Sequence, residues 1–567
     1  MKRYGKWFAL LLSLSLLFSM ISACGNGTGS AGSEAETQSE AASTSAPAME
    51  QNSPEEERAA SAESVPDNAT SAPDELFVDV ALPLVEERET LSMWWGGYDG
   101  GNFGNDNPGV TLMSQAAIEA TNVEIDYRFC SGMDFIDQTS LVFASGDWPD
   151  MFRCASMYSG GLSAGVEENV FLNLADYDLE QNSPNYYARI TSNDDLYKQV
   201  STDEGYLAKY YTIYDEPLRQ NTGLLVRTDY LDQLGLSLPE TYDDWHTMLQ
   251  GFKNDLGLAE PFILDTSGLL DMLTAGYGVN SSWYQIDGQV YYAPVQEGFR
   301  EYLTMVNQWY AEGLIHQDFM NNTVSDERLN KIYNGTCGAY VDDYGSITSF
   351  KLLSEDPNFE SSAVSAPVKK AGDQTHFYAG GALVENMDNG GIAISTSCEN
   401  VELCMRWMDF FYSEKGSLIF SYGLEGETYT DNGDGTYSFT ELITNNPDWP
   451  ITFARLIYLD GCAGTGLYRS AAKDINLDEG SLEAEEIWGV SDNAYVIPSY
   501  DLNGTDASTF AAIMGDIETY VDEMVLKFIT GAESLDGFDD YAATIEAMGL
   551  PKAIALKQDG LDRYNAR

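Results

Sequence analysis

The sequence predicts an α/β protein that contains a parallel β-sheet. Residues 91–97, 123–129 and 149–154 are apolar, or alternate apolar with polar side chains, which is typical of strands. The segments between them, 109–122 and 133–146, carry apolar residues at helical spacing. This β-α-β-α-β order predicts parallel strands joined by right-handed crossovers.

A second region of strands and helices begins at the apolar stretch 223–227. Residues 228–234 are predicted to form a short helix that ends at Gly235. Thr241 and Asp244 approximate a capping box, and a helix with apolar residues at helical spacing follows them. Apolar stripes of this kind indicate core rather than cofactor sites.

The C-terminal half contains three further predicted helices. The stretch GGIAISTSCENVELCMRWMDFF predicts a strand and then a helix that Thr396 and Glu399 cap and that stops at Gly416. IETYVDEMVLKFITG and FDDYAATIEAMGLP predict amphipathic helices. Gly531 closes the first of these, and the segment Gly549–Pro551 closes the second.

The N-terminus has the pattern of an export signal. A basic start, KRYGK, precedes an apolar run that is too short and too rich in serine for a membrane span. Residues 21–24, ISAC, resemble the lipobox of bacterial lipoproteins, in which cleavage precedes a cysteine that is then lipidated. We therefore expect residues 1–23 to be a signal peptide and Cys24 to carry the lipid anchor. An ordinary signal peptide with an incidental cysteine is the alternative.

The segment 24–75 is predicted to be a disordered acidic tether. It consists largely of Ser, Ala, Thr, Gly and Glu, with almost no large apolar side chains. Such a segment cannot bury enough surface to offset its ordering entropy. A folded prodomain is the alternative.

Residues 76–567 are predicted to form the folded part, which is too long for one ordinary domain. Hydrophobic residues make up 44% of the chain, so there is ample material for a core. The net charge is −61, which disfavours nucleic acid and anionic lipid headgroups as partners. The same charge disfavours an anionic sugar unless the binding cleft is locally basic. Arg219 and Arg227 are the arginines that we nominate for such a cleft.

The sequence gives little indication of an enzyme active site or a cofactor site. The chain has three His and neither an HExxH motif nor a phosphate-binding or dinucleotide glycine motif, so we expect no cofactor. The residues GLSAG, 161–165, match G-x-S-x-G, but a polar, glycine-rich stretch precedes them where a nucleophile elbow needs a strand. Apart from Cys24, the six cysteines show neither a CxxC pair nor zinc spacing, and both disulfides and free buried thiols stay open. They are Cys130, Cys154, Cys337, Cys398, Cys404 and Cys462.

The order of these elements resembles the extracellular solute-binding proteins of family 1, the carbohydrate-type lipoproteins of ABC transporters. Residues 223–245, 338–346, 394–429 and 525–550 carry the resemblance, which extends over nearly all of 88–567. Its most specific parts are the segments around Arg227–Trp245 and Phe410–Tyr429.

The resemblance implies a type II periplasmic-binding-protein-like fold, with two discontinuous α/β lobes that close on ligand. We expect lobe 1 to comprise about 88–215 with 385–425, and lobe 2 about 222–384 with 426–567. The hinge is expected near Tyr211–Asn221.

The implied function is binding rather than catalysis. The protein would capture a carbohydrate, expected to be an oligosaccharide, in the interlobe cleft and deliver it to the permease subunits of an ABC importer. A separate ATPase chain would power that importer. The implied location is the extracellular face of a bacterial cell membrane, through the lipid anchor, and we expect a monomer that binds no nucleic acid.

A sugar site needs flat apolar faces for the rings and polar groups for the hydroxyls. Aromatic residues make up 12% of the chain, with 35 Tyr, whose rings combine an apolar body with a polar tip. Ligands of α/β sheets bind beyond the carboxyl ends of strands. Those ends and the family's pattern suggest the following ligand-binding residues: Trp95, Tyr98, Asp99, Met157, Tyr158, Arg219, Trp283, Asp342, Asp343, Tyr344, Tyr422 and Glu425.

One stretch resembles a calcium loop. In TDNGDGTYSFTE, Asn432, Asp434 and Glu441 stand at EF-hand offsets, but Thr430 replaces the first acidic ligand. NGDGT is also typical of a hairpin turn, so we predict a hairpin and no metal site.

Two other functions stay open at this point. One is an exported glycoside hydrolase or esterase, which would consume its ligand. The other is an importer receptor for peptides or another polar solute.

Overall fold

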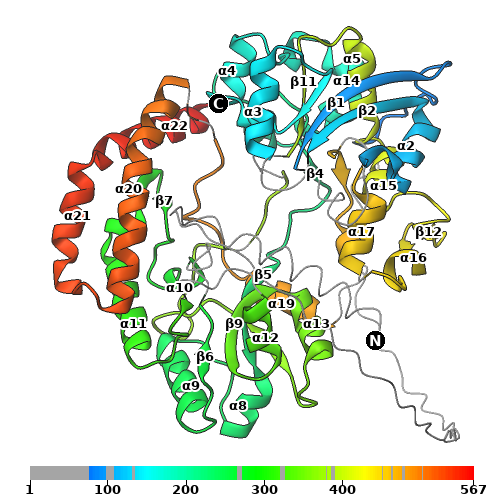
Figure 1. Ribbon diagram of the computed structural model, residues 1–567. Helices are drawn as coiled ribbons and strands as arrows, with labels where there is room; N and C mark the ends of the chain where they lie inside the picture. Colours follow the sequence, from blue (N-terminus) through cyan, green and yellow to red (C-terminus); the bar gives the residue numbers. More distant parts are fainter. Residues whose placement is uncertain are drawn as a thin grey trace, which may run out of the picture. The chain divides into compact units, whose positions relative to one another are not determined.

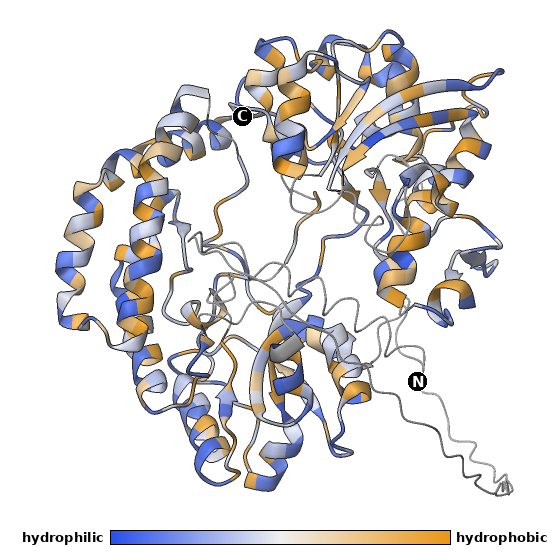
Figure 2. Ribbon diagram, viewed as in Figure 1, coloured by the Kyte–Doolittle hydropathy of each residue, from blue (hydrophilic) through white to orange (hydrophobic). Residues whose placement is uncertain are grey.

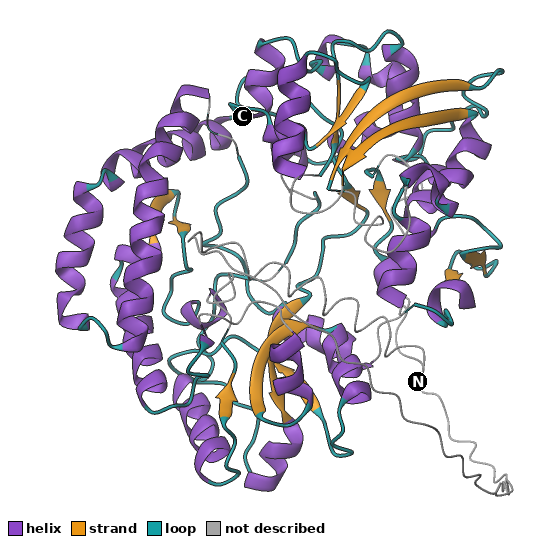
Figure 3. Ribbon diagram, in the orientation of Figure 1, coloured by secondary structure: helices purple, strands orange, loops and turns teal. Residues whose placement is uncertain are grey.

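The computed structural model describes residues 76–97, 107–130, 135–264, 271–319, 326–378, 380–384, 390–449, 451–461, 464–474, 479–500, 502 and 504–567. The predicted signal peptide, Cys24, the predicted tether, Tyr98, Asp99 and Cys462 lie outside the described residues. Helices predominate over strands in the described part (Figure 3). None of the described helices combines the length and apolarity that a membrane span requires.

The first sheet contains the predicted β-α-β-α-β unit. Its elements are β1 (Glu89–Gly96), α2 (Leu112–Thr121), β2 (Val123–Cys130), α3 (Phe135–Ser145), β3 (Met151–Arg153) and β11 (Ile392–Ile394). The strand order is β11-β3-β1-β2. β1 pairs in parallel with both β2 and β3, and β11 is antiparallel to β3 (Figure 1). The predicted α/β unit with parallel strands is thereby confirmed.

Alternation along β1 places side chains on both faces of this sheet. Met93 and Trp95 belong to one buried cluster, whereas Trp94 belongs to a second cluster with Phe152 of β3. Burial on both faces is the usual state of parallel strands. Because β1 and β3 are parallel, their carboxyl ends lie at the same edge of the sheet.

The second sheet has a different topology, with the order β10-β5-β9-β6. Its strands are β5 (Thr222–Arg227), β6 (Glu260–Phe262), β9 (Cys337–Asp343) and β10 (Ser361–Val364). β5 is antiparallel to β9 and β10, and β6 is parallel to β9. Leu224 and Val226 face one cluster and Leu225 faces another, so this sheet also is buried on both faces.

The helices after β5 follow the sequence prediction closely. They are α8 (Thr228–Leu234) and α9 (Tyr242–Asn254). Gly235 ends α8 in the left-handed region at φ 67°, which a glycine adopts without strain. At the start of α9, Thr241 Oγ1 accepts a hydrogen bond from Asp244 N at 3.1 Å, and the Asp244 carboxylate accepts one from Thr241 N at 2.9 Å. The predicted capping box is confirmed, and hydrogen bonds that the Thr241 hydroxyl and the Thr241 N–H donate to the carboxylate lower the pKa of Asp244.

The region after β11 differs from its prediction in two respects. The helices are α14 (Val401–Phe410) and α15 (Glu414–Tyr422). Asn400 caps α14 by accepting from Leu403 N, while Thr396 Oγ1 donates to Asn169 O, so the predicted cap at Thr396 and Glu399 is wrong.

Gly416 does not stop a helix either, because it lies in the first turn of α15. A Cβ there would overlap the carbonyl oxygen of Phe410. The close approach of α14 and α15 is therefore what requires glycine at this position.

The C-terminal helices extend the second core, and the first of them packs beside α11 (Glu297–Ala311). They are α20 (Gly504–Thr530), α21 (Phe538–Ala547) and α22 (Leu550–Ala566). Figure 1 shows them in orange and red, and in Figure 2 they carry both hydrophobic and hydrophilic residues, as amphipathic helices do. The predicted helices and their glycine ends at Gly531 and Gly549 are confirmed, whereas Pro551 lies in the first turn of α22.

The remaining elements are short or peripheral. The helices are α4 (Gly161–Glu167), α5 (Leu179–Asn182), α6 (Pro184–Ile190), α7 (Asp194–Val200), α10 (Asp271–Thr274), α12 (Asp326–Tyr333), α13 (Gly345–Leu353), α16 (Glu441–Thr444), α17 (Ile451–Leu459), α18 (Ala471–Asp474) and α19 (Glu479–Trp488). The strands are β4 (Ile213–Tyr214), β7 (Trp283–Ile286), β8 (Gln289–Tyr292), β12 (Tyr429–Asp431), β13 (Tyr437–Phe439) and β14 (Leu467–Tyr468). The 3-10 helices are η3 (Pro108–Val110), η4 (Ala155–Met157), η5 (Leu174–Asp176), η6 (Ala293–Val295) and η8 (Leu535–Gly537).

Within the described residues, three chain segments connect the regions of the two sheets. Tyr210 bridges Ile392, and Arg219 bridges Gly380, so these two segments run antiparallel. In the third segment β14 pairs in parallel with β4. The predicted hinge, Tyr211–Asn221, coincides with the first of these segments.

One stretch packs differently from the predicted lobe boundaries. Tyr429, Phe439, Leu459 and Leu467 belong to the buried cluster of the first sheet, although residues 426–567 were expected in lobe 2. In the same region, α17 packs against α2 and α15, and β14 packs against α15. Sequence patterns could not reveal this return of the chain, because periodicity shows that a helix has an apolar face but not what that face covers.

Candidate ligand-binding site

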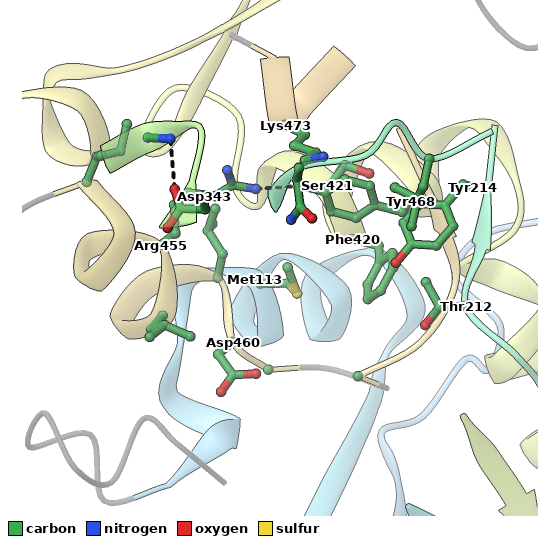
Figure 4. Close-up of a pocket in the computed structure, with 18 of the residues that line it drawn as sticks. Met113, Thr212, Tyr214, Asp343, Phe420, Ser421, Arg455, Asp460, Tyr468 and Lys473 are labelled. Carbon is green, nitrogen blue, oxygen red and sulfur yellow. Dashed lines mark hydrogen bonds between the residues drawn. The ribbon is translucent and has the colours of Figure 1, made fainter. Parts of the chain in front are cut away.

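A cavity of about 710 Å³ lies where the connecting segments meet the ends of β3 and β9. Met113 of α2 and Arg153 of β3 line it from the first sheet, and Asp343 and Tyr344 line it from the second. Figure 4 shows side chains from these separate parts of the chain around one space. The cavity therefore joins residues that lie more than two hundred positions apart in sequence.

Strand alternation at the end of β9 separates two neighbouring carboxylates. Asp343 lines the cavity and accepts a hydrogen bond from Gly345 N at 2.7 Å. Asp342 instead pairs with Arg328 at 3.1 Å, and burial raises its pKa. Tyr344 follows at the start of α13 and also lines the cavity.

Aromatic rings form a second part of the cavity wall. Tyr214 of β4 packs edge-on against Tyr468 of β14, with ring centroids 5.9 Å apart. Phe420 of α15 packs edge-on against the same Tyr468 at 6.1 Å. All three residues line the cavity (Figure 4). Such rings offer apolar faces with polar tips, which suit a ligand that has both apolar and polar surfaces.

A buried glutamate positions two cations at the cavity. Glu485 of α19 lies 3.3 Å from Arg219 and 3.5 Å from Lys473, and its side chain is only 1% exposed. The Lys473 ammonium also stands 5.2 Å from the centroid of the Tyr344 ring. The glutamate thus holds both cationic side chains in place at the cavity wall.

Two more cations come from the first-sheet region. The Arg153 guanidinium stands over the ring of Trp95 at 4.5 Å. Arg455 of α17 donates to the Tyr468 hydroxyl at 2.5 Å. Both arginines line the cavity, where their N–H groups suit oxygen-rich ligands.

Three residues from the sequence prediction lie together at this cavity, namely Arg219, Asp343 and Tyr344. Trp95 is fully buried beneath it, where its ring supports Arg153. Tyr98 and Asp99 lie outside the described residues.

Met157 and Tyr158 do not line the cavity. Cys154 turns the chain after β3 with φ 70°, and the following residues fold against the cluster around Phe143. Tyr158 donates to Glu168 at 2.7 Å, and this bond raises the pKa of Tyr158 to about 12.

The other predicted ligand residues lie elsewhere. Asp342 is turned away to Arg328, as described above. Trp283 packs against Tyr292 and Phe510, with ring centroids 4.7 and 5.6 Å away. Tyr422 is buried among Tyr429, Tyr437 and Phe439. Glu425 lines a second cavity of about 490 Å³ beside α2 and α15.

Arg227, the second arginine that the sequence nominated, also lies away from the cavity. It is fully buried and pairs with Asp229 at 2.7 Å and Asp356 at 3.0 Å. Its guanidinium packs between the rings of Tyr230 and Phe359. These contacts give it a structural role in the second core.

The stretch 430–441 forms a hairpin, as predicted, because β12 and β13 pair antiparallel across it. Asn432 donates to Thr436 and Ser438, and Asp434 accepts from Thr436, so both side chains hold the turn. Among the described residues, His, Cys, Asp and Glu form no group of three or more that would hold a metal ion.

Nucleophile chemistry finds little support in the described part of the chain. Ser163, at the centre of GLSAG, lies within α4 and donates to Glu204, rather than standing at a strand-to-helix turn. The described cysteines are all free thiols, and Cys398 Sγ lies 3.4 Å from Cys404 Sγ. Burial raises the pKa of Cys154 to about 11 and that of Cys337 to about 12, so both are protonated at neutral pH.

Sequence reasoning missed most of the cationic side chains. Arg153 stands at the carboxyl end of the third predicted strand, so the strand-end rule could have found it. Arg455 and Lys473 come from α17 and α18, and no local pattern places those helices at the cavity. The aromatic residues Tyr214, Phe420 and Tyr468 were missed for the same reason.

Comparison with known proteins identifies the family. The family model of the bacterial extracellular solute-binding proteins matches the sequence over residues 80–417, which is more than half of the chain. This chain belongs to that family. The family resemblance predicted from the sequence is thus confirmed.

Relatives of this solute-binding protein include two curated proteins. The fructooligosaccharide ABC transporter substrate-binding protein FusA of Streptococcus pneumoniae is 22% identical over 529 residues, which cover 88% of this chain and 95% of FusA. The lipoprotein LipO of Bacillus subtilis is 22% identical over 362 residues, which cover 60% of this chain and 68% of LipO.

A solved structure confirms the fold. The alginate-binding protein AlgQ2 without calcium ion matches with a TM-score of 0.67 at 20% sequence identity, covering 84% of this chain and 99% of AlgQ2. The solute-binding protein described here therefore has the type II, two-lobed α/β fold that the resemblance implied.

Proposed function

We propose that this solute-binding protein captures an oligosaccharide in the 710 Å³ cavity and delivers it to the permease subunits of an ABC importer. The observation that carries the proposal is the make-up of the cavity wall. Tyr214, Phe420 and Tyr468 offer apolar ring surface, and Arg219, Asp343 and Tyr344 offer hydrogen-bonding groups for hydroxyls. The names of FusA and AlgQ2 refer to saccharides and support the same ligand class.

We propose that the ligand leaves intact, so that the protein is a receptor and not a hydrolase. FusA and AlgQ2 are named as binding proteins, which supports this reading. The connecting segments at the cavity, including β4 and β14, would allow the regions of the two sheets to close on the ligand. Closure of this kind is a common response of hinged two-domain binding proteins.

We also propose that Cys24 anchors a monomeric protein to the extracellular face of the membrane, as the lipobox pattern predicts. The name of the relative LipO supports a lipoprotein. The net charge of −61 makes a nucleic acid an unsuitable partner.

Thermal shift of the purified full chain against mono- and oligosaccharides, followed by product analysis of each hit, tests the function. A ligand at 100 times its dissociation constant adds about 2.7 kcal/mol of stability. A stabilising saccharide that is recovered intact would support the receptor function. Consumption of the saccharide would favour a glycoside hydrolase or esterase. A thermal shift with peptides alone would show that the ligand is a peptide and not a saccharide.

A further inference from the structure

The cavity has the opposite charge balance to the rest of the protein. The chain contains 90 Asp and Glu against 29 Lys and Arg. Among the described residues that line the cavity, the cations are Arg153, Arg219, Arg455 and Lys473, and the carboxylates are Asp343 and Asp460. Cations thus outnumber carboxylates at this cavity, although carboxylates prevail about threefold in the chain.

Arg455 contributes a positive charge to the cavity that no neighbouring carboxylate balances within the described residues. Its guanidinium donates to the neutral hydroxyl of Tyr468 at 2.5 Å and stands 5.4 Å from the centroid of the Phe439 ring. Within the described part of the chain, no carboxylate forms an ion pair with it. Guanidinium has five N–H donors in a planar fork, so a hydroxyl partner leaves donors for a ligand oxygen.

Arg219 and Lys473 add to this excess. Both pair with the single carboxylate of Glu485, at 3.3 and 3.5 Å, so two positive charges face one negative charge. The Arg219 side chain is 52% exposed, whereas that of Glu485 is buried behind it. The cavity therefore presents the cations to a ligand and hides their shared counter-ion.

A neutral sugar does not need this arrangement, because its hydroxyls both donate and accept and are also bound by neutral amides and by carboxylates. An anion approaching a protein of charge −61 is repelled at long range, but salt limits that repulsion to about 10 Å at 0.1 M. Inside that distance the cations at the cavity wall decide the binding energy. Guanidinium groups also match the planar oxygen pairs of carboxylates in two parallel hydrogen bonds.

From these contacts we infer that the ligand is an acidic saccharide, with carboxylate or sulfate groups that Arg455, Arg219 and Lys473 bind. This inference rests on the proposed saccharide-binding function and names the class of saccharide. Arg153, whose guanidinium stacks on the buried ring of Trp95, extends the same cationic wall from the first sheet.

Calorimetry with matched saccharides tests the inference. The purified full chain is titrated with neutral trisaccharides and their acidic counterparts: galactotriose with trigalacturonate, mannotriose with trimannuronate, and galactotriose with a sulfated galactotriose. We expect at least one acidic member to bind roughly tenfold or more tightly than its neutral counterpart. Its affinity should fall as NaCl rises from about 50 to about 300 mM, because salt screens the charge pairs.

Variants assign the effect to the cavity. Arg455→Gln should weaken the acidic member roughly tenfold and leave the neutral member within about twofold. Lys473→Gln provides a second variant if Arg455→Gln unfolds. Arg300→Gln is the matched control, because Arg300 lies on α11 away from the cavity and pairs with the exposed Asp539, so the same loss of charge should change neither affinity.

The outcomes separate the inference from the function on which it rests. A neutral saccharide that binds as tightly as its acidic counterpart would overturn the inference and keep saccharide capture. Equal losses for both members in Arg455→Gln would do the same. Tight binding of the sulfated saccharide alone would support the inference of an acidic ligand and show that its charged groups are sulfates. Binding of peptides with no saccharide of either set would overturn both proposals.

Discussion

Asp409 of α14 shows how burial can overcome good hydrogen bonding. Its carboxylate accepts bonds from Asn185 Nδ2 and Tyr186 N, both at 2.8 Å, and these bonds favour the ionised form. Burial outweighs them and raises the pKa of Asp409 to about 6. Because the pKa rises on folding, this group's stabilising contribution is present below pH about 4 and is lost as the pH rises through about 6.

The free energy of unfolding of Asp409→Asn, relative to that of the parent protein, should therefore increase as the pH rises from about 4 to about 7. The relative gain has an upper bound of about 3 kcal/mol, since one pKa unit corresponds to about 1.4 kcal/mol. Urea denaturation of both proteins at several pH values measures it. The other titrating groups are common to both proteins, so their effects cancel in the comparison. A difference in unfolding free energy that does not change with pH would contradict the raised pKa of Asp409.

Gly416 tests a steric requirement at a single residue. Gly416→Ala should destabilise the protein by roughly 2–4 kcal/mol, because the new Cβ would overlap the Phe410 carbonyl oxygen in the turn between α14 and α15. Gly515→Ala is the control. Gly515 lies inside α20 with open space around it, so alanine there should stabilise by about 0.5–1 kcal/mol. Similar denaturation midpoints for the two variants would rule out the clash.

At the level of elements, one carboxylate joins the C-terminal helix to the loop after α7. Asp203 is 5% exposed, lies 2.5 Å from Arg563 Nε, and also pairs with Arg567. Arg563 lies in the last turn of α22 and Arg567 directly follows this helix, which packs on α20 in the second core. The ion pairs thus connect a loop between two residues of the first core, Val200 and Leu207, to a helix of the second core.

Asp203→Ala should lower the free energy of unfolding by about 2–4 kcal/mol, because it leaves two arginines without their shared counter-ion. Urea denaturation measures this loss. Asp539→Ala removes the exposed partner of Arg300 and should have little effect. An equally small effect of both changes would show that the Asp203 contacts are as solvent-screened as a surface pair.

The elements differ in how well the sequence predicted them. The β1-α2-β2-α3-β3 unit followed from periodicity, since both its crossovers are local in sequence. The start of α14 was mispredicted because Thr396 and Asn400 both satisfy the local capping pattern, and packing against Asn169 selects between them. The antiparallel pairing of β5 with β9 joins residues more than a hundred positions apart, beyond the reach of local patterns.

For the whole molecule, the net charge of −61 predicts salt-dependent stability. Raising NaCl from about 20 to about 200 mM should raise the Tm, because screening reduces repulsion within the compact state. Choline chloride at equal ionic strength is the control for specific ion effects and should act alike. A Tm that stays constant or falls would contradict net self-repulsion. Binding of an acidic saccharide should show the opposite salt dependence.

Anchoring also concerns the whole molecule. In a bacterial host, Cys24→Ser should move the protein from the membrane fraction to the soluble exported fraction, because the thiol that accepts the lipid is lost. Fractionation followed by immunoblotting measures this shift. Ser22→Ala is the control and should leave the protein on the membrane. Retention of Cys24→Ser on the membrane would contradict the lipid anchor.

The sequence by itself determined the features that depend on neighbouring residues. These are the α/β class, the capping box of Thr241 and Asp244, the hairpin at 430–441, and a family resemblance extensive enough to be recognised. It also placed Asp343 and Tyr344 at a strand end, where α/β proteins bind ligands. Each of these follows from backbone periodicity, turn chemistry or a strand's direction, which a few adjacent residues specify.

Only the tertiary structure decided which side chains meet at the cavity. Trp95 and Arg153 end neighbouring strands, yet packing buries the ring and leaves the guanidinium at the cavity wall. Arg455 and Lys473 arrive on helices whose sequences carry no sign of a site. An overall composition averages charge over the whole chain, whereas binding depends on charge within a Debye length. A strongly acidic sequence can therefore fold around a basic cavity, and three-dimensional packing alone reveals it.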